Sequence, residues 1–580
     1  MKQSIWILAA VSAAALAACG GGGSSDPAPV DTGTSPGTVV TPAALSLSGV
    51  AATGAAIASQ PVSAKCATGT GTAPSNVDGS YTISVTGGAL PCVLKVTAAD
   101  GTDLFSVATG SGSTAVANIN PVTQLIVASL AGTDPAAYFT AFDTSAAAAV
   151  TSDKVTAAVA TVKTTLAAAG IDLSSVDVLT GTLTPATTTS TGNAYDQALD
   201  ALAAQFTAAG TTLAMLTETI VVTSPAAPAP VETPTSPTAS LPAELLLKPP
   251  ASNCAALRSG TYRVVSPKDD NLVPSSGKIT INAATLVQTD PDGSTSTWKA
   301  HPTEACHFTD DTGTADILVS QAGVIVSRAS DDKGGYDLYF AFPEQTHTLA
   351  ELEGTWNMMG MEYQDAGTGS LGQALTVTLN ATGTATAATV CQDPSTWSLT
   401  STCTTAGASD LPTFTVNADG GFSNSGFGSL YAYRAGNGDL MLVSVNLNDG
   451  SFKVATKQRV NVMPAVDRVY TGWDMIVTKQ LLTTPVITES TNTVISVDST
   501  AGTYVRRAKT VGGVDERLET IAINNPRDGY NFRAAAATTT TAGVPFNVTE
   551  WTNLSLRGMG LNALIRPSQK QFMFSVQQPL

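Results

Sequence analysis

Histidine is the scarcest side chain here with metal-binding or acid–base chemistry, and two of the three histidines lie close together. His301 and His307 flank Glu304 in the segment Lys299–His307. Imidazole and carboxylate groups are ligand types that Zn²⁺ accepts. However, the histidine spacing beside Cys306 matches no zinc motif, and the sequence contains neither CxxC nor HExxH. We therefore interpret this segment as a polar loop, and the sequence predicts neither a metal site nor a cofactor.

Hydrolytic chemistry needs a nucleophile with its base, or two facing carboxylates. The sequence has no GxSxG motif and no GxxxxGK[ST] phosphate loop. Paired aspartates fall in predicted turns, where Asp forms local hydrogen bonds; they are Asp269-Asp270, Asp310-Asp311 and Asp331-Asp332. The segment Asp290–Gly293 begins like a calcium loop, but His301 stands where the closing glutamate is needed. These patterns favour a non-enzymatic protein, with a hydrolase of unrecognised carboxylate pair as the alternative.

Aromatic side chains offer a second kind of site, because indole rings stack on sugars and apolar polymers. All but one of the six tryptophans lie beyond residue 297. The candidate ligand-binding residues are Trp298, Trp356, Trp473 and Trp551. The alternative is that these rings fill β-domain cores, where one or two tryptophans are ordinary.

Cysteine spacing predicts disulfides. The chain has seven cysteines, of which Cys19 stands apart near the N-terminus. The other six are Cys66, Cys92, Cys254, Cys306, Cys391 and Cys403. Six cysteines allow about fifteen connectivities. Sequential pairing keeps each bond inside one predicted domain, which gives Cys66–Cys92, Cys254–Cys306 and Cys391–Cys403.

The first residues have the composition of an export signal. Lys2 precedes the apolar run Ile5–Leu16, which is too short to span a bilayer stably, and Leu16-Ala17-Ala18-Cys19 follows. This segment resembles the lipobox of bacterial lipoproteins. The resemblance implies removal of residues 1–18 and attachment of a diacylglycerol and an N-acyl chain, such as palmitate, to Cys19. Several acyl chains hold a protein on a membrane, since each buried CH₂ contributes about 0.8 kcal/mol.

The residue after the lipobox cysteine bears on location. Gly20 stands where inner-membrane retention usually shows aspartate, so the same resemblance implies the outer membrane, facing the periplasm or the cell surface. Residues 19–43, rich in Gly, Ser, Pro and Thr, predict a flexible tether. The formal net charge of −17 excludes nucleic acid as an expected partner. The expected partners are the membrane, through lipid, and an extracellular ligand, polymer or envelope protein.

The elements that must position these residues begin with residues 44–117, whose short alternating runs predict a β-sandwich. The run Ser48–Val50, the strand Val62–Cys66 and the turn Asp78-Gly79 before Tyr81 resemble the carboxypeptidase-regulatory-like, transthyretin-type sandwich. That resemblance covers about 70 residues and implies a spacer or binding module without an active site.

Residues 118–222 change to helical periodicity. Asn120, Ser152 and Asn193 are the predicted N-caps, and Gly132, Gly170 and Gly210 are the predicted ends. Stripes of Val, Leu and aromatic residues at helical spacing predict a short helical bundle packed on the sandwich. Residues 223–250 hold eight prolines and predict an extended linker.

Residues 251–580 read as β throughout, in three units: 251–345, 346–460 and 461–580. The units open with a glycine and an aromatic residue, as Gly260-Thr-Tyr262, Gly354-Thr-Trp356 and Gly472-Trp473. The last two units contain hairpins around Arg434 and Arg566 that align without a gap. The pattern of Gly354-Thr-Trp356 with a late arginine resembles the lipocalin-type barrel, and it implies that Arg434 stacks over the Trp356 ring.

The 580 residues exceed one ordinary domain. We expect a multidomain, mainly β chain: a small β-sandwich and a short helical bundle, then a C-terminal all-β region of about three tandem antiparallel barrels or sandwiches. The expected function is that of a non-enzymatic envelope lipoprotein presenting β domains for binding or adhesion. An extracellular polymer hydrolase and a structural or assembly lipoprotein of the envelope are the alternatives.

Overall fold

The computed structural model describes most of the chain beyond the predicted tether. The described residues are 44–224, 241–267, 275–330, 336–364, 369–392, 399–424, 426, 428–477, 487–510 and 516–578. Residues 1–43, with Cys19, lie outside them.

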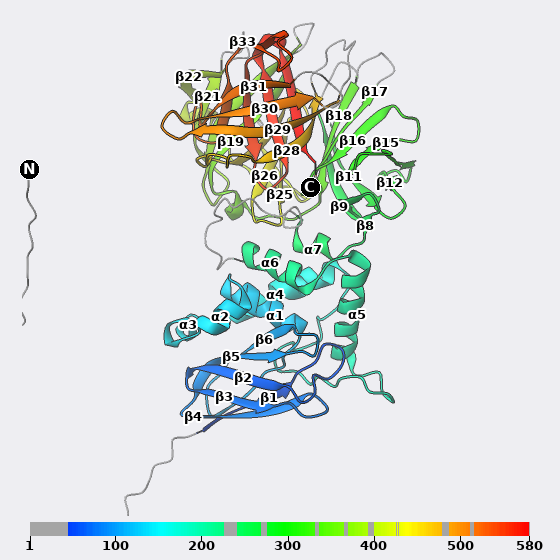
Figure 1. The fold of residues 1–580 in the computed structure, drawn as a ribbon, viewed down its shortest axis with the longest axis vertical. Helices are drawn as coiled ribbons and strands as arrows, with labels where there is room; N and C mark the ends of the chain where they lie inside the picture. The colour runs from blue at the N-terminus through cyan, green and yellow to red at the C-terminus, as the bar shows by residue number, and fades with distance from the viewer. Residues whose placement is uncertain are drawn as a thin grey trace, which may run out of the picture. The chain divides into compact units, whose positions relative to one another are not determined.

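Two small sheets form the N-terminal sandwich (Figure 1). One has the order β4-β1-β7, from β1 (Ala44–Val50), β4 (Ser80–Thr86) and β7 (Thr114–Val116). The other has the order β3-β2-β5-β6, from β2 (Pro61–Thr68), β3 (Thr70–Pro74), β5 (Ala89–Thr97) and β6 (Asp103–Ala108). Alternate residues such as Leu45, Leu47, Tyr81 and Ile83 are buried between the sheets, as period-two strands require. The predicted sandwich is confirmed.

A helical bundle follows, with α1 packed against α4 and α6 (Figure 1). The helices are α1 (Pro121–Ala131), α2 (Pro135–Ala141), α3 (Thr144–Ala148), α4 (Ser152–Ala168), α5 (Ala194–Ala209) and α6 (Leu213–Thr223). The predicted caps Asn120 and Asn193 are confirmed, with side chains that accept backbone N–H groups of the first turn. The predicted cap Ser152 is wrong by one residue, because Thr151 accepts from the N–H of Lys154 and Ser152 is already helical.

The segment predicted as an extended linker contains a packed helix. Residues 225–240 lie outside the described residues, but α7 (Ala243–Leu246) follows them. The side chains of Leu241, Leu245 and Leu246 are at most 4% exposed. The apolar run in this segment, rather than its prolines, therefore decides the structure after residue 240.

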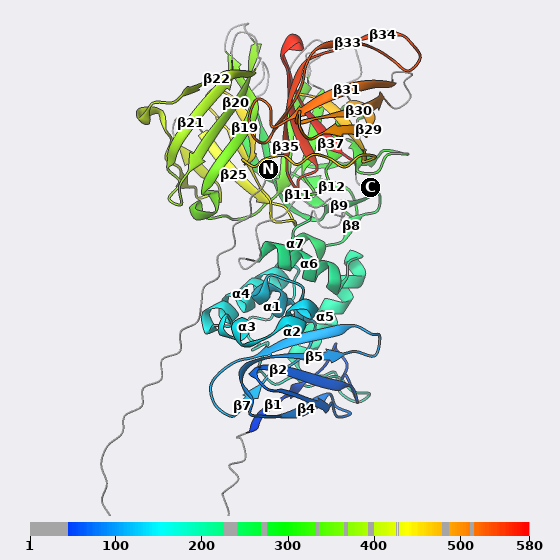
Figure 2. The same ribbon diagram turned by 60° about the vertical axis from the view of Figure 1, so that its left-hand side comes forward.

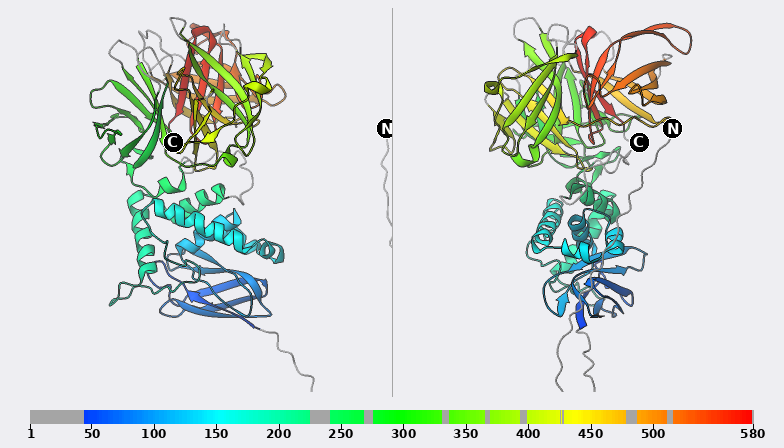
Figure 3. Two further views of the ribbon diagram at one scale, coloured as in Figure 1. Left: turned by 180° about the vertical axis from the view of Figure 1, so that it is seen from behind. Right: turned by 90° about the vertical axis from the view of Figure 1, so that its left-hand side faces the viewer.

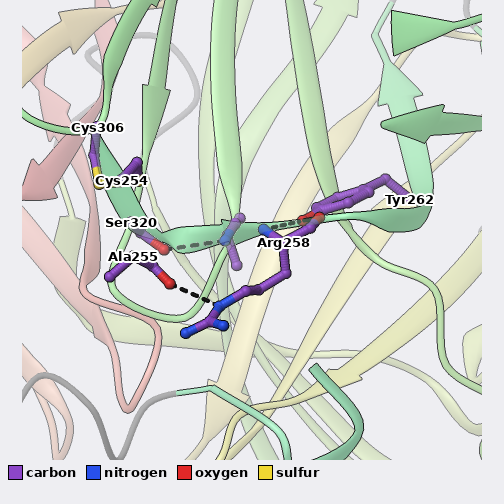
Figure 4. The surroundings of a disulfide bond; sticks show 7 residues. Cys254, Ala255, Arg258, Tyr262, Cys306 and Ser320 are labelled. Carbon is purple, nitrogen blue, oxygen red and sulfur yellow. Dashed lines mark hydrogen bonds between the residues drawn. A yellow bond between two sulfur atoms is a disulfide. The ribbon is translucent and has the colours of Figure 1, made fainter. Parts of the chain in front are cut away.

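Arg258 joins this region to the first β unit. It ends β9 (Cys254–Arg258), which pairs with β8 (Pro250–Ala251). Its Nη1 donates to the carbonyls of Ala209 at 2.9 Å and Lys248 at 2.6 Å. Figure 4 shows its Nε directed at the Ala255 carbonyl, beside the Cys254–Cys306 disulfide. Burial lowers the pKa of Arg258 to about 10.

The first β unit is a nine-stranded meander whose first and last long strands pair. Its order is β13-β12-β11-β10-β18-β17-β16-β15-β14. The strands are β10 (Gly260–Ser266), β11 (Ser275–Asn282), β12 (Val287–Thr289), β13 (Thr295–Thr297), β14 (Lys299–Ala300), β15 (His307–Thr309), β16 (Ala315–Val319), β17 (Ile325–Ser330) and β18 (Tyr336–Pro343).

The second unit repeats this topology with nine strands in the order β22-β21-β20-β19-β27-β26-β25-β24-β23. Figure 2 shows β19, β20, β21 and β22 side by side in this unit. The strands are β19 (Gly354–Gln364), β20 (Gly369–Leu379), β21 (Ala385–Gln392), β22 (Leu399–Thr405), β23 (Thr415–Val416), β24 (Phe422–Asn424), β25 (Gly428–Arg434), β26 (Leu440–Val445) and β27 (Phe452–Lys457). The cation over the Trp356 ring is Lys457, at 5.4 Å, because Trp356 pairs with it across β19 and β27. The predicted partner Arg434 lies on β25 and binds Glu351 at 2.8 Å.

The third unit closes completely into an eight-stranded barrel, drawn in orange and red in Figure 3. Its strands in order are β28 (Val469–Ile476), β29 (Ile487–Asp498), β30 (Thr503–Thr510), β31 (Glu516–Ile523), β32 (Tyr530–Arg533), β35 (Trp551–Leu556), β36 (Leu561–Arg566) and β37 (Gln571–Gln577). A separate hairpin joins β33 (Ala536–Thr539) to β34 (Pro545–Val548).

The gap-free alignment of the Arg434 and Arg566 hairpins is offset by one strand in the fold. The Arg566 hairpin, β36–β37, includes the strand that closes the barrel onto β28. The Arg434 hairpin is β25–β26, and β27 closes that sheet onto β19. Similar hairpin sequences therefore occupy different positions in the two units.

One apolar core is shared by all three units. It includes Phe340 of β18, Phe452 of β27 and Phe574 of β37, each from the strand that closes its sheet. Their ring centroids lie 5.7 Å apart for Phe340–Phe452, 5.1 Å for Phe340–Phe574 and 6.2 Å for Phe452–Phe574. The predicted mainly β class, with a sandwich, a helical bundle and three barrel-like units, is confirmed.

Among the described residues, no single helix has the length and apolar composition to cross a membrane. The helices α5 and α6 meet that test only when taken together, across a bend of 95°.

Candidate functional site

The third barrel presents its apolar face outward and a mixed, largely polar face inward. On β37, Phe572 and Phe574 point into the core shared with the other units. The intervening Met573 and Ser575, with Gln577, line the inside of the barrel. Because strand side chains alternate between two faces, packing the apolar face outward leaves the other face for the lumen.

The lumen of this barrel is a cavity of about 490 Å³. Pockets for small molecules have volumes of about 300–1,000 Å³. Every strand of the barrel contributes lining residues, and Phe546 of the β33–β34 hairpin lines it too. The barrel therefore has room for a small ligand.

Positive charge dominates the lining. Seven lining residues carry cationic side chains, and Asp474 carries a carboxylate. The cationic residues are Arg468, Arg506, Lys509, Arg517, Arg533, Arg557 and Arg566. Residues 461–580 contain 11 Lys and Arg against 9 Asp and Glu, a formal net charge of +2, although the whole chain carries −17. Basic residues are therefore more frequent in the third unit than in the rest of the chain, which is strongly acidic.

Glu519 neutralises part of this charge. Its carboxylate is fully buried and lies 2.7 Å from Arg506, 2.8 Å from Arg517 and 2.6 Å from Arg533. Burial alone would raise the pKa of Glu519, but the three guanidinium groups outweigh burial and lower this pKa to about 2. One carboxylate shared by three cations leaves the group positively charged.

Two further features concern individual residues of the lumen. Burial, with the nearby Arg506 and Arg566, lowers the pKa of Arg533 to about 10 despite its ion pair. The Nε of Arg566 and the Oδ1 of Asn553 are buried without a hydrogen-bond partner, and both residues line the lumen. Unpartnered buried polar groups are costly, so they mark positions where a ligand or water would bind.

The same lumen has an apolar side, formed by one cluster of buried residues. These residues are Val494, Tyr504, Ile521, Trp551, Leu564 and Met573. The guanidinium groups of Arg506 and Arg533 lie 5.5 Å and 5.3 Å from the Trp551 ring centroid. An aromatic ring that faces two cations sits at the junction between the charged and apolar parts of the cavity.

Among the described residues of the other two units, apolar side chains are packed in the interior. In each, the residue two positions after the glycine, Tyr262 or Trp356, is buried in the inner core. The cavity beside Trp356 is only about 10 Å³. In the third unit the aromatic directly follows Gly472, so Trp473 points outward into the shared core, and Asp474 takes the inward position. Because the residue between glycine and tryptophan is missing here, the side chains of β28 face the opposite way. The Trp473 ring therefore lies outside the lumen.

Comparisons with known proteins add little. No family model matches this chain, and no curated protein matches it. A protein of unknown function of the DUF3598 family from Nostoc punctiforme PCC 73102 is 12% identical, with 40% of this chain and 98% of that chain covered and a TM-score of 0.14. Transferrin binding protein B from serogroup B Neisseria meningitidis is 6% identical, with 55% and 75% covered and a TM-score of 0.17. A mutant of Transferrin binding protein B from Haemophilus parasuis Hp5 is 9% identical, with 57% and 78% covered and a TM-score of 0.13.

TM-scores this low carry no argument about function. The chemistry of the site therefore rests on the residues of this chain.

The four candidate tryptophans are all buried, at 5% exposure or less. Trp298 and Trp356 lie in the inner cores of the first and second units, and Trp473 lies in the shared core. Trp551 lines the lumen of the third barrel. Of these tryptophans, Trp551 is the one that the structure places where it can contact a ligand in the large cavity.

Two predicted disulfides are present. Cys66–Cys92 joins β2 to β5, and Cys254–Cys306 joins β9 to the residue before β15. Cys403 is disulfide-bonded, and the side chain of its predicted partner, Cys391, lies outside the described residues.

The aspartate pairs are turn residues where the structure describes them. Asp310 accepts backbone N–H groups from Thr314 at 2.6 Å and Ala315 at 2.8 Å. In the calcium-like segment Asp290–Gly293, Asp292 likewise accepts from the N–H of Ser294 at 2.9 Å. The pairs Asp269-Asp270 and Asp331-Asp332 lie outside the described residues.

The histidines form a closer group than a polar loop requires. His301 and His307 stack with centroids 4.7 Å apart and ring planes at 10°. The donor atoms of His301, Glu304 and His307 all lie within 4.8 Å of one another. The sequence shows the three residues but not this stacking, which depends on the pairing of β14 with β15.

Proposed function

We propose that this chain is a non-enzymatic binding protein whose third barrel holds a small anionic ligand with an apolar part. The observation that carries the proposal is the surplus of positive charge in the lumen, where seven cationic side chains accompany the two carboxylates of Asp474 and Glu519. Guanidinium groups bind carboxylates, sulfates and phosphates through charge-assisted, often bidentate hydrogen bonds. An anion beside Arg566 and Arg533 would gain such bonds and reduce the repulsion between the cations.

The apolar part of the ligand follows from the cluster around Trp551. A purely inorganic anion would leave this side of the cavity in contact with water, whereas an alkyl or aromatic group would cover it. The ligand class is therefore an organic acid or an organic phosphate or sulfate, with the charged end toward the arginines.

Hydrolase chemistry lacks support in the same cavity. A glycosidase needs two carboxylates about 5–10 Å apart. Among the described residues that line the lumen, the carboxylate is that of Asp474. Glu519 accepts from three arginines, so it is held ionised and is unsuited to act as a general acid.

We propose also that lipid on Cys19 anchors the chain at the outer membrane, and that residues 19–43 tether it there. In this scheme the sandwich is a transthyretin-type spacer, and the three β units are presented to the periplasm or the exterior. A Cys19→Ser variant should lose fatty-acid labelling and leave the membrane fraction. Retention of both would refute the anchor. A purely structural role in the envelope would not require the positive charge in the lumen.

Binding can be tested on the full chain by titration calorimetry with decanoate and with its cationic counterpart, decyltrimethylammonium. Decanoate should bind one site per chain, and the cation should not. An Arg566→Gln variant should weaken decanoate binding by tenfold or more. The matched control is Arg507→Gln, because Arg507 lies on β30 beside Arg506, outside the lumen lining, and pairs with Glu516 at 2.9 Å. Equal binding of the two amphiphiles, or no effect of Arg566→Gln, would overturn the proposal.

A further inference from the structure

A second group of polar side chains lies outside the lumen, at the start of β15. The His301 N–H donates to the His307 carbonyl at 2.8 Å, so the two residues face each other where β14 and β15 stop pairing. Their rings stack, and Glu304 lies in the connection between them. Cys306, directly before His307, is fixed by its disulfide to Cys254. The backbone therefore holds both imidazoles in place.

The three side chains direct their donor atoms toward one another. The Nδ1 of His307 lies 2.7 Å from Oε2 of Glu304, and the Nδ1 of His301 lies 3.9 Å from Oε1. The Nδ1 of His301 accepts the Glu304 N–H at 3.1 Å, so in the neutral ring it is the nitrogen without a proton. An imidazole nitrogen binds a metal through this unprotonated lone pair, so the ion would replace the Glu304 N–H as its partner.

Two of the three donor groups, His307 and Glu304, also have an outer neighbour. The Nε2 of His307 lies 3.5 Å from a carboxylate oxygen of Asp316, and Trp473 donates from Nε1 to Oε2 of Glu304 at 2.9 Å. In metal sites, the imidazole that ligates through one nitrogen usually donates the other N–H to a carboxylate, and ligating carboxylates are themselves hydrogen-bonded. The arrangement thus supplies a hydrogen-bonded support for Glu304 and places a carboxylate beside His307.

We propose that His301, Glu304 and His307 bind one divalent transition-metal ion, Zn²⁺ by preference. Two imidazoles and a carboxylate match the ligands of tetrahedral zinc sites that leave the fourth position to water. Zinc–ligand distances of about 2.0–2.2 Å place tetrahedral ligands about 3.3 Å apart. The donor atoms already lie within 4.8 Å of one another, so an ion would need only to draw the most distant of them closer.

The site is accessible to solvent, and its ligand types favour some metal ions over others. The side chains of His301 and Glu304 are 29% and 25% exposed, so an ion can enter from solvent. Nitrogen ligands favour zinc-like ions over Mg²⁺ and Ca²⁺, which prefer oxygen. Since Glu304 also holds Trp473 of the third barrel, the bound ion would stabilise the contact between the first and third units.

The test is titration calorimetry of the tag-free, EDTA-treated full chain with Zn²⁺. We expect one ion per chain, a raised unfolding temperature, and no response to Mg²⁺ or Ca²⁺. The variants His301→Gln and Glu304→Gln should each weaken binding by tenfold or more; His301 is the more exposed histidine of the site, so its loss should leave the fold intact.

The matched control is His347→Gln. His347 lies outside the group, 3.3 Å from Glu351 and 3.1 Å from Gln345 through its two ring nitrogens, and its loss should leave Zn²⁺ binding unchanged. Absence of one-to-one Zn²⁺ binding, or equal affinity in His301→Gln and wild type, would overturn the site. The same outcome would leave the three side chains as a hydrogen-bonded link between the two units.

Discussion

The guanidinium of Arg533 donates to Oε1 of Glu519 at 2.6 Å, inside the barrel and out of contact with solvent. Arg506 and Arg517 share the same carboxylate. A buried carboxylate with three cationic partners is held in its charged form, and the partners are held in place around it. This relationship fixes the arginine cluster in the lumen before any ligand arrives.

Loss of this carboxylate should cost stability in a pH-dependent way. The folded-state pKa of Glu519, about 2, lies below its ordinary value of 4.5. At pH values above 4.5, the ionised Glu519 therefore contributes about 3 kcal/mol to the free energy of unfolding. This contribution is lost as the pH falls from 4.5 through about 2. Urea unfolding should show Glu519→Gln less stable than wild type at pH 7, with the difference shrinking below pH 4.5. A difference that stays constant down to pH 2 would contradict the assignment.

Filling the lumen should abolish ligand binding and preserve the fold. Asp474 occupies the inward position that Tyr262 and Trp356 fill in the other units. We expect Asp474→Phe to reduce decanoate affinity at least tenfold, because the ring takes up part of the cavity, with an unfolding temperature within a few degrees of wild type. Asp474→Asn removes only the charge and should bind decanoate more tightly. Tighter binding in both variants would argue against a ligand inside the barrel.

The two described disulfides should differ in their contribution to stability. Cys254–Cys306 closes a loop with a sequence separation of 52, and Cys66–Cys92 one of 26. Chain entropy predicts losses of about 4 and 3.5 kcal/mol when each pair is replaced by serines. Urea unfolding of the two double variants measures this. Thiol titration of unreduced, denatured wild type should find no more than a trace of free thiol.

Close approach of two strands should make one glycine irreplaceable. A Cβ on Gly360 of β19 would lie 2.0 Å from the Phe452 carbonyl oxygen and 2.6 Å from the Lys453 Cα. Gly360→Ala should therefore push β27 away from the shared core and destabilise the chain by several kcal/mol. The control is Gly277→Ala in β11, where the nearest atom is 3.9 Å away. Similar unfolding temperatures for the two variants would refute the argument.

Local signals in the sequence predicted the elements well. Asn120 and Asn193 cap helices, and alternating Leu and Val residues bury one face of the sandwich strands, because these patterns depend on neighbours in the chain. Cysteine pairing succeeded for Cys66–Cys92 and Cys254–Cys306 because each pair lies within one folded segment.

The candidate site could not be derived in the same way. The sequence shows that Gly472-Trp473 lacks the intervening residue of Gly354-Thr-Trp356, but alternation alone does not say which face of a strand meets a neighbouring sheet. Only the shared core shows that Trp473 points outward and Asp474 inward. The partner of Trp356 was missed for a related reason, since Lys457 reaches the ring through long-range strand register.

The packing of Phe340, Phe452 and Phe574 against one another has a consequence for evolution. The outer surface of the third barrel contributes much of its apolar packing, so substitutions of lumen residues outside the Glu519 cluster are largely decoupled from folding. Such a scaffold can acquire new specificity by substitution of arginines or apolar residues inside one barrel, while packing against the other two units keeps that barrel folded. Expression of that barrel without the other two units would instead expose its apolar outer face and lead to aggregation.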